Sequence, residues 1–244
     1  MERSTYGIVM LAPEDKKKFV KEKFSSISPK YDLLNSLLSM QIDRYWRWVT
    51  TRELKSCPDG HVLDLCAGTL PLALELARQA PRRRVLAVDF CEDMLRSGMN
   101  NLAGDARMSR IFPVCGDGEE IPAASDCFCG ITVAFGVRNL ANTQQGLHEM
   151  WRILQPGGKL LILEFSRPKH FLIKPLYTFY LNRVLPKVAG MVSGDKEAYE
   201  YLASSIAKFY EPTELLTMME KAGFARNYRR PLTMGIVTLY IGVK

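Results

Sequence analysis

The sequence predicts an α/β protein with a doubly wound, mostly parallel seven-stranded sheet, preceded by helices and carrying a helical insertion after the fifth strand. From Gly60 onward, short apolar runs alternate with helix-length segments, which is the pattern of a parallel sheet covered on both faces. The third run contains Pro113, whose missing N–H suits an edge strand, and the third strand is an edge in the order 3-2-1-4-5. The last two runs, 224–228 and 235–243, are too close together for a crossover helix and should be antiparallel.

Five apolar runs mark the strands of the parallel part of the sheet. In chain order they are Val62–Cys66, Val85–Val88, Ile111–Cys115, Cys127–Phe135 and Leu160–Phe165. Helices are expected between them: one begins at Pro71, one covers Glu92–Leu102, and one follows Asn142 and Gln145, which are spaced as a capping box. The turn Pro156-Gly157-Gly158 is expected to end this helix and precede the fifth strand.

The chain is expected to divide into four segments. Residues 1–58 form an N-terminal helical cap, because the apolar positions of 14–55 recur at helical spacing. The α/β core occupies residues 59–169. Residues 170–211 break the alternation with aromatic-rich, mostly helical sequence, and residues 212–244 supply a helix and the antiparallel strand pair that complete the core.

Composition and charge narrow the class of protein. With 244 residues, 47% of them hydrophobic, the chain can bury one core with a small helical appendage. No apolar run approaches the roughly 20 residues that span a bilayer, so a soluble, cytoplasmic protein is expected. Six cysteines without a C-x-x-C pair and only three histidines fit neither a disulfide framework nor a zinc site, and no metal is expected. The net charge of +7 gathers in clusters such as 16–18 and 82–84, and charge alone does not separate anionic lipid from nucleic acid as a partner.

A candidate site is expected at the carboxyl ends of the parallel strands. In open α/β sheets, ligands bind at these ends, near the switch point between strands 1 and 4. The residues at that edge are Asp64–Thr69, Asp89, Asp117-Gly118 and Ala134–Asn139. A glycine turn after strand 1 lets the backbone approach a ligand, and an acid ending strand 2 can accept hydrogen bonds from both hydroxyls of a ribose.

A nicotinamide dehydrogenase would share these features, but two observations disfavour one. The first turn contains a single glycine, Gly68, instead of the G-x-G-x-x-G that makes room for a pyrophosphate. The chain also ends in an antiparallel pair rather than in a second mononucleotide-binding half.

Several stretches carry a more specific resemblance. They are Lys30-Tyr31-Asp32-Leu33-Leu34-Asn35, Val62-Leu63-Asp64-Leu65-Cys66-Ala67-Gly68-Thr69, Phe135-Gly136-Val137-Arg138-Asn139, Met150-Trp151-Arg152-Ile153-Leu154-Gln155-Pro156-Gly157-Gly158 and Leu163-Glu164-Phe165-Ser166-Arg167-Pro168. With them the chain, from about residue 19 to its C-terminus, resembles the menaquinone/ubiquinone-biosynthesis C-methyltransferases. Enzymes of this family are class I S-adenosylmethionine-dependent methyltransferases with a Rossmann-like sheet, and they methylate a ring carbon of a polyprenylated quinol.

The resemblance implies S-adenosyl-L-methionine as the cofactor, bound by the α/β core. The candidate cofactor-binding residues are Asp64, Gly68, Thr69, Asp89, Asp117, Gly118 and Ala134. Thr69 would line the methionine end, Asp89 would hold the ribose, and Asp117 with Gly118 would lie beside the adenine. A simpler role stays open for two of the acids, because Asp64 can cap a turn and Asp117 can satisfy loop amides.

The sequence departs from the family pattern in two places. Gly-Thr-Gly-Asp becomes Gly68-Thr69-Leu70-Pro71, and the serine usual before Phe-Gly is Ala134. Because Leu70 precedes a proline, its backbone is expected to be extended, which would rebuild the loop coherently instead of damaging it. Either way, the change bears on the affinity for the cofactor.

Arg138, Asn139 and Tyr31 are the candidate catalytic residues. Methyl transfer from a sulfonium is an in-line displacement, so the protein mainly aligns the reactants in a dry site. A quinol ring carbon becomes nucleophilic when the neighbouring hydroxyl loses its proton. Arg138 is therefore expected to stabilise the phenolate and Asn139 to orient it or a water that accepts the proton, unless the pair only ties down its loop. Tyr31 is expected either to line the same pocket or to pack on its helix.

The leading prediction is S-adenosylmethionine-dependent C-methylation of a lipophilic quinol, demethylmenaquinol-like or polyprenyl-benzoquinol-like. Two alternatives stay open: methyl transfer to another small aromatic or lipid-like acceptor, and a catalytically silent relative that binds cofactor within a biosynthetic complex. Nucleic-acid modification is disfavoured, because no basic stripe interleaved with aromatics adjoins the predicted site. The expected partners are a lipophilic acceptor and the inner membrane surface, contacted transiently through the N-terminal lysines; a homodimer is allowed but not required.

Overall fold

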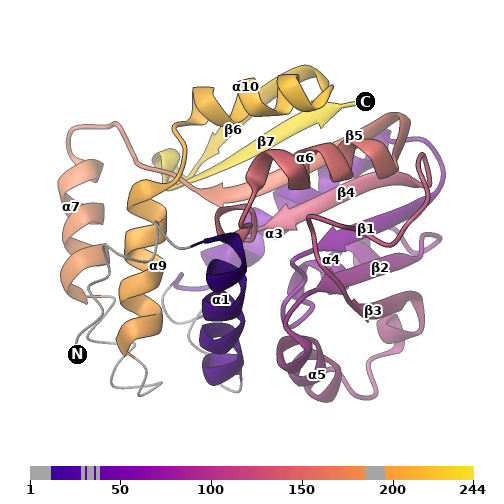
Figure 1. Ribbon diagram of the computed structural model, residues 1–244, viewed down its shortest axis with the longest axis horizontal. Coiled ribbons are helices and arrows are strands. Elements are labelled where there is room, and N and C mark those ends of the chain that lie inside the picture. Colours follow the sequence, from indigo (N-terminus) through magenta and orange to yellow (C-terminus); the bar gives the residue numbers. More distant parts are fainter. Residues whose placement is uncertain (1–11, 29–30, 32–35, 37–38, 185–195) are drawn as a thin grey trace.

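A computed structural model describes residues 12–28, 31, 36, 39–184 and 196–244 of the chain. Its centre is a seven-stranded sheet in the order β3-β2-β1-β4-β5-β7-β6 (Figure 1). The strands are β1 (His61–Leu65), β2 (Val85–Asp89), β3 (Ile111–Cys115), β4 (Phe128–Ala134), β5 (Leu154–Phe165), β6 (Ala225–Leu232) and β7 (Val237–Val243). This order confirms the doubly wound, mostly parallel fold expected from the sequence.

The strand pairing confirms the predicted topology and corrects one boundary. Parallel ladders join β1 to β2 and β4, β2 to β3, and β4 to β5, whereas β7 runs antiparallel to both β5 and β6. β3 is an edge strand and carries Pro113, as predicted. β5, however, begins at Leu154 rather than Leu160. Leu154 pairs with Phe128 and Lys159 with Gly130, so the Pro-Gly-Gly turn forms an irregularity within the strand instead of preceding it.

Helices flank the sheet and fill the predicted insertion after β5. They are α1 (Pro13–Ile27), α3 (Ile42–Arg52), α4 (Pro71–Gln79), α5 (Glu92–Asn101), α6 (Thr143–Ile153), α7 (Ile173–Phe179), α9 (Lys196–Lys208) and α10 (Pro212–Ala222). Shorter turns are the 3-10 helices η3 (Glu53–Ser56), η4 (Ala106–Arg110), η5 (Val137–Asn139) and η7 (Thr233–Gly235) and the π-helix η6 (Tyr180–Val184). As predicted, Gly223 ends α10, with a φ of 108°. Within the described parts of the chain, no helix is long and apolar enough to cross a bilayer.

Two apolar layers hold the sheet between its helices. On one face, Leu147 and Met150 of α6 pack with Leu215 and Met219 of α10. On the other face, α3, α4 and α5 supply a second buried cluster that includes Trp46. At the carboxyl ends of the strands, α1 packs against both α5 and α9 and spans the space between them (Figure 1).

The capping box predicted at the start of α6 is only half formed. Asn142 Oδ1 accepts a hydrogen bond from the Gln145 amide at 3.1 Å. The Gln145 side chain does not return to Asn142 but donates to the Glu119 carbonyl at 3.4 Å. It therefore joins α6 to the loop after β3.

The loop after β1 corrects the expectation for Leu70. Its backbone is not extended but left-handed, with φ 70° and ψ 19°, and Cys66 and Gly68 each have a φ of 55°. The Leu70 side chain is fully buried, and its N–H donates to the Ala67 carbonyl at 2.9 Å. Burying a leucine stabilises by about 1.5–3 kcal/mol, which offsets the roughly 1–2 kcal/mol cost of the left-handed conformation. The loop is thus rebuilt around an apolar anchor.

Gly98 of α5 fixes the position of this loop. A Cβ at Gly98 would lie 2.6 Å from the Thr69 carbonyl oxygen and 2.7 Å from its carbonyl carbon. Both atoms belong to the backbone and cannot rotate away. Helix α5 therefore packs against Thr69 at a distance that only glycine permits.

Gly98→Ala is expected to destabilise the protein by about 1–3 kcal/mol, as overpacking does, although alanine favours helices by about 1 kcal/mol over glycine. Thermal unfolding of the variant measures the effect. Asn100→Ala, at an exposed position of the same helix, is the matched control and should leave the melting temperature unchanged or raise it. A Gly98→Ala protein as stable as the wild type would contradict the proposed packing.

Candidate active site

Two cavities adjoin each other at the carboxyl ends of the strands. The larger, of about 440 Å³, is mostly apolar and is lined by residues of α1, α3, α7 and α9 and of the segments that follow β4 and β5. The smaller, of about 30 Å³, lies over the ends of β1 and β2. Arg138 lines the larger cavity and the next residue, Asn139, lines the smaller. The turn η5 therefore forms the boundary between them.

Asp89 anchors the smaller cavity. It ends β2, as predicted, and only 9% of the residue is exposed. Its Oδ2 accepts a hydrogen bond from the Gly68 amide and its Oδ1 one from the Cys91 amide, both at 2.8 Å. Burial raises the pKa of Asp89, and the hydrogen bonds from backbone amides oppose that rise. The acid is thereby fixed beside the first loop, with lone pairs left on each oxygen.

Asp64 is a buried acid with one unsatisfied oxygen. Its Oδ1 accepts a hydrogen bond from Thr132 Oγ1 at 2.9 Å, whereas its Oδ2 has no hydrogen-bond partner. Complete burial raises the pKa of Asp64 to about 7, against the lowering effects of the Thr132 hydrogen bond and of the Ala73 amide, which lies too far off hydrogen-bond geometry to satisfy Oδ2. An orphaned buried oxygen costs free energy unless a cation or donor reaches it.

The seven candidate cofactor residues divide into two groups. Asp89, Asp117 and Gly118 line the smaller cavity together. The residues that line neither cavity are Asp64, Gly68, Thr69 and Ala134. Gly68 nevertheless contacts the smaller cavity indirectly, because its amide donates a hydrogen bond to Asp89.

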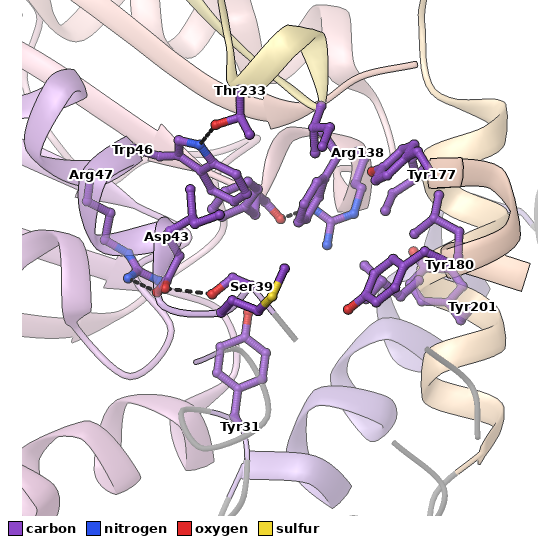
Figure 2. A pocket seen from close by; sticks show the side chains of 18 of the residues that line it. Tyr31, Ser39, Asp43, Trp46, Arg47, Arg138, Tyr177, Tyr180, Tyr201 and Thr233 are labelled. Carbon is purple, nitrogen blue, oxygen red and sulfur yellow. Dashed lines mark hydrogen bonds and ion pairs between the residues drawn. The ribbon is translucent and has the colours of Figure 1, made fainter. Parts of the chain in front are cut away.

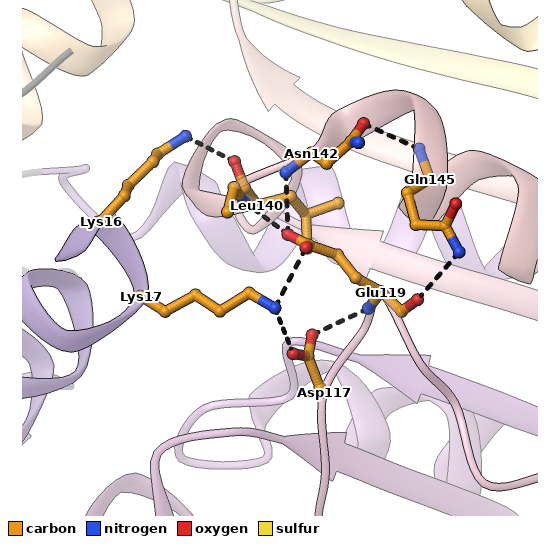
Figure 3. A network of polar contacts seen from close by, with 8 residues as sticks. Lys16, Lys17, Asp117, Glu119, Leu140, Asn142 and Gln145 are labelled. Carbon is orange, nitrogen blue, oxygen red and sulfur yellow. Dashed lines mark hydrogen bonds and ion pairs between the residues drawn. The ribbon is translucent and has the colours of Figure 1, made fainter. Parts of the chain in front are cut away.

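A lysine of α1 reaches into the smaller cavity (Figure 3). Lys17 Nζ lies 2.6 Å from Asp117 Oδ2 and 3.1 Å from Glu119 Oε2. Asp117 Oδ1 also accepts the Glu119 amide at 2.9 Å, so the loop-amide role left open for Asp117 is realised. The hydrogen bonds that Lys17 donates to Asp117 and Glu119 raise the pKa of Lys17, whereas burial lowers it.

Lys16 lies beside it and also points toward the core. Its Nζ donates to the carbonyls of Arg138 at 3.3 Å and Leu140 at 2.5 Å. Burial lowers the pKa of Lys16. Two lysines of the basic N-terminal cluster thus contact the candidate site, and Lys18 and Lys21 are the exposed ones.

Arg138 lines the larger cavity (Figure 2) and is held from behind by a buried ion pair with Glu164. Arg138 Nη1 lies 2.9 Å from Glu164 Oε1, and the two side chains are only 5% and 0% exposed. The same guanidinium donates to the Phe135 carbonyl, and its Nε has no hydrogen-bond partner. Burial raises the pKa of Glu164, whereas the charge of Arg138 lowers it.

Tyrosines surround this guanidinium. Tyr201 donates from its hydroxyl to Asn139 Oδ1 at 3.1 Å and thereby ties α9 to the boundary turn. The Tyr177 hydroxyl is buried without a hydrogen-bond partner, and burial raises the pKa of Tyr177. Tyr31 lines the cavity and packs edge-on against Phe24 with ring centroids 6.0 Å apart. Asp32 and Asn35, quoted in the same motif, lie outside the described residues.

A second ion pair lies on the wall formed by α3. Asp43 pairs with Arg47, one helical turn away, and accepts a hydrogen bond from Ser39 Oγ at 2.7 Å. Trp46 Nε1 donates to Thr233 Oγ1 at 2.7 Å. The cavity therefore combines an apolar body with four charged residues on its walls, Lys23, Asp43, Arg47 and Arg138.

Sequence reasoning missed the partners that hold these candidates in place. Glu164 is a lone acid in an otherwise apolar strand, and that isolation was a usable signal. Asp43 and Arg47 have the i, i+4 spacing of a helical ion pair. Nothing in the sequence pattern pairs Lys17 with Asp117, because 100 residues separate them.

Comparison with solved structures places the fold. A methyltransferase of Thermotoga maritima, described as S-adenosylmethionine-dependent, is 19% identical, covers 91% of this chain and 98% of its own, and has a TM-score of 0.61. A second, from Aquifex aeolicus, is 16% identical with a TM-score of 0.56, covering 78% and 85% of the two chains. These similarities establish the class I methyltransferase fold.

Relatives found by sequence have a far higher sequence identity to this chain than these solved structures have. A ubiquinone/menaquinone biosynthesis C-methyltransferase UbiE of Geotalea daltonii is 40% identical over 92% of this chain and 96% of its own length. A demethylmenaquinone methyltransferase of Deinococcus radiodurans is 41% identical over 95% of each chain. The model of the ubiE/COQ5 methyltransferase family matches residues 10–244. The chain belongs to the ubiE/COQ5 methyltransferase family.

Proposed function

We propose that this chain transfers a methyl group from S-adenosylmethionine to a ring carbon of a lipophilic quinol. The observation that carries the proposal is the buried guanidinium of Arg138, which faces an apolar cavity of about 440 Å³ and adjoins the cavity that contains Asp89. The sequence relatives, named for ubiquinone or menaquinone biosynthesis, support the same acceptor class.

The residues around the smaller cavity suit S-adenosylmethionine. Asp89 would accept hydrogen bonds from the ribose hydroxyls, and Asp117 with Gly118 would adjoin the adenine. Asp64 and Thr69 line neither cavity as it stands; when the cofactor enlarges the smaller cavity, Asp64 Oδ2 would hold the ammonium of the methionine end, beside Thr69. The cofactor supplies an electrophilic methyl group on a sulfonium. Because the cavity of about 30 Å³ is much smaller than this molecule, Lys17 would have to leave Asp117 when the cofactor binds.

The larger cavity suits a quinol ring that must lose a proton. Its apolar walls exclude water, which strengthens the attraction between a phenolate and the Arg138 guanidinium. Glu164 fixes the guanidinium, so little reorganisation is needed when the negative charge develops. Asn139, held by Tyr201, would orient the phenol oxygen or the water that takes its proton. The unpartnered Tyr177 hydroxyl is a further donor for the ring oxygens.

The proposal is tested by anaerobic single-turnover assays with methyl-labelled S-adenosylmethionine and a reduced, demethylated quinol. We expect one labelled methyl group on a ring carbon of the product, located by NMR. Cofactor binding without transfer to this acceptor would contradict the proposal. Methyl transfer to a different aromatic compound would then support an enzyme with another small aromatic or lipid-like acceptor. No transfer to any acceptor would support a catalytically silent member of the family.

Neutralising the buried pair should abolish most of the rate. Removing Arg138 alone would leave Glu164 as an uncompensated buried charge, at a cost of about 3–5 kcal/mol. The double variant Arg138→Gln/Glu164→Gln avoids this and should lower the single-turnover rate by about 10²–10³-fold, as loss of a preorganised donor does. The matched control, Asp43→Asn/Arg47→Gln, neutralises the other ion pair of the same cavity and should have a much smaller effect. Equal rate losses in both variants would assign no special role to Arg138.

The raised pKa of Asp64 gives cofactor binding a pH dependence. The ionised form attracts an ammonium, so affinity for S-adenosylmethionine should rise between about pH 6 and 8, around the pKa of about 7. The stability of the free protein should change with pH in the opposite direction. Folding raises the pKa of the Asp64 carboxyl, so the folded protein should lose stability as the pH rises from the ordinary pKa of 3.8 to about 7.

Calorimetric titrations across this range check the dependence, with Asp64→Asn as the comparison. The amide is close to the carboxylate in size and can still accept from Thr132, but it carries no charge. We expect weaker binding with a flatter pH profile, in which Asp89 accounts for any remaining slope. An identical slope in the variant and the wild type would remove Asp64 from the ammonium site.

We further place this activity in the cytoplasm, at the inner surface of the membrane that contains the lipophilic acceptor. The exposed Lys18 and Lys21 of α1 support contact with anionic lipid, whereas Lys16 and Lys17 are engaged in the site.

A further inference from the structure

Four strongly exposed apolar side chains lie close together near one end of the molecule. Phe171, Leu172, Leu176 and Phe179 are 75%, 61%, 66% and 60% exposed. All four lie within nine consecutive residues, on α7 and the loop before it, and α7 lies at the outer end of the fold (Figure 1). Soluble proteins rarely leave such a contiguous apolar patch uncovered without a partner.

Helix α7 is apolar on more than one side. Ile173, Leu176 and Tyr177, at i, i+3 and i+4, line the larger cavity. Leu172 and Phe179 do not line it and are exposed. A helix that is hydrophobic around most of its circumference is normally surrounded by apolar material. Among the described residues of α7, only the side that faces the cavity is covered by protein.

The exposed patch lies at the mouth of the acceptor cavity. Two residues both line the cavity and are strongly exposed: Leu176, which is 66% exposed, and Met40, which is 77% exposed. A cavity of about 440 Å³ matches a drug-sized ligand, that is, a quinol ring with a short part of its tail. The rest of a polyprenyl chain must leave through this mouth, past α7.

The charge around the patch is positive. The described residues 165–184 contain four Lys or Arg and neither Asp nor Glu. Lys174 and Arg183 are exposed, and Lys169, 81% exposed, has only a 3.6 Å contact with Glu211. Basic residues that flank an apolar helix complement the anionic headgroups of a bilayer surface.

We propose that the segment His170–Phe179 docks on a bilayer containing anionic lipids, with Phe171, Leu172 and Phe179 inserted among the headgroups and acyl chains. The inference rests on the proposed function for its purpose: the tail of the acceptor stays in the bilayer while its ring enters the cavity. It differs from contact through the N-terminal lysines, since two of those lysines are engaged in the site. The occupant of the patch is a lipid surface, because its apolar groups are continuous with the cavity and its rim is basic.

Vesicle flotation of the full chain tests this docking. Wild-type protein should float with vesicles of phosphatidylcholine and phosphatidylglycerol, and less with phosphatidylcholine alone. The variant Phe171→Ser/Leu172→Ser/Phe179→Ser, in which no altered residue lines the cavity, should lose at least about tenfold in vesicle affinity. Lys169→Gln/Lys174→Gln should weaken binding to the anionic vesicles only.

Two controls fix the surface involved. Met99→Ser/Phe112→Ser removes exposed apolar side chains from α5 and β3 and should bind vesicles like the wild type. Lys18→Gln/Lys21→Gln tests the exposed lysines of α1 and should bind better than the α7 variants. Because all substituted side chains are exposed, unchanged thermal unfolding of each variant verifies that folding is intact.

Activity separates failure of the docking from failure of the proposed function. The α7 serine variant should methylate a short-tailed, water-soluble quinol at the wild-type rate but lose rate on a long-tailed quinol in vesicles. Vesicle binding without methyl transfer to either quinol would leave the docking and overturn the function. Unchanged vesicle binding by the serine variant would overturn the docking. The docking would also be overturned if sedimentation without vesicles showed a dimer of the wild type and a monomer of the serine variant. The patch would then be the contact with a second copy of the chain.

Discussion

The ion pair between Arg138 and Glu164 is the constraint on which the geometry of the site depends. It joins the turn after β4 to the end of β5, with both side chains almost fully buried. The parallel ladder between β4 and β5 brings these strand ends together, and the ion pair then fixes the Arg138 side chain, because each buried charge offsets part of the desolvation of the other. As a result, one guanidinium lies where the apolar cavity meets the cavity of Asp89. In the proposed function, a lipophilic ring and a polar cofactor would approach this guanidinium from the two cavities.

Different elements of the fold form the two cavities that meet at this guanidinium. The α/β core contributes backbone amides and acids, with Asp89 held by the amides of Gly68 and Cys91. The helices outside the core contribute the apolar walls and their tyrosines. Helix α1 belongs to both parts, since it lines the larger cavity and inserts Lys17 between the acids of the smaller one. If the cofactor binds beside Asp117 as proposed, Lys17 must leave its two acid partners, so cofactor binding would change the contacts of α1.

Local patterns in the sequence were sufficient for the architecture but not for the partners within the site. Apolar runs, Pro113 at an edge and the short gap before β7 predicted the strand order, and the acid at the end of β2 was found from position alone. The prediction of an extended backbone at Leu70 was wrong. The rule for residues before proline is local, and burial of the Leu70 side chain in the core outweighs it. Glu164, Tyr177 and Lys17 act through contacts between residues far apart in the chain, which periodicity does not encode.

The most direct test of this account is the pKa of a bound phenol. A naphthol analogue that cannot be oxidised should bind in the larger cavity and be titrated by its absorbance in wild type and in Arg138→Gln/Glu164→Gln. If Arg138 stabilises the phenolate by a charge-assisted hydrogen bond, the bound phenol should have a pKa about one to two units lower in the wild type than in the variant. The same pKa in both proteins, with binding retained, would contradict the role of Arg138 in the site.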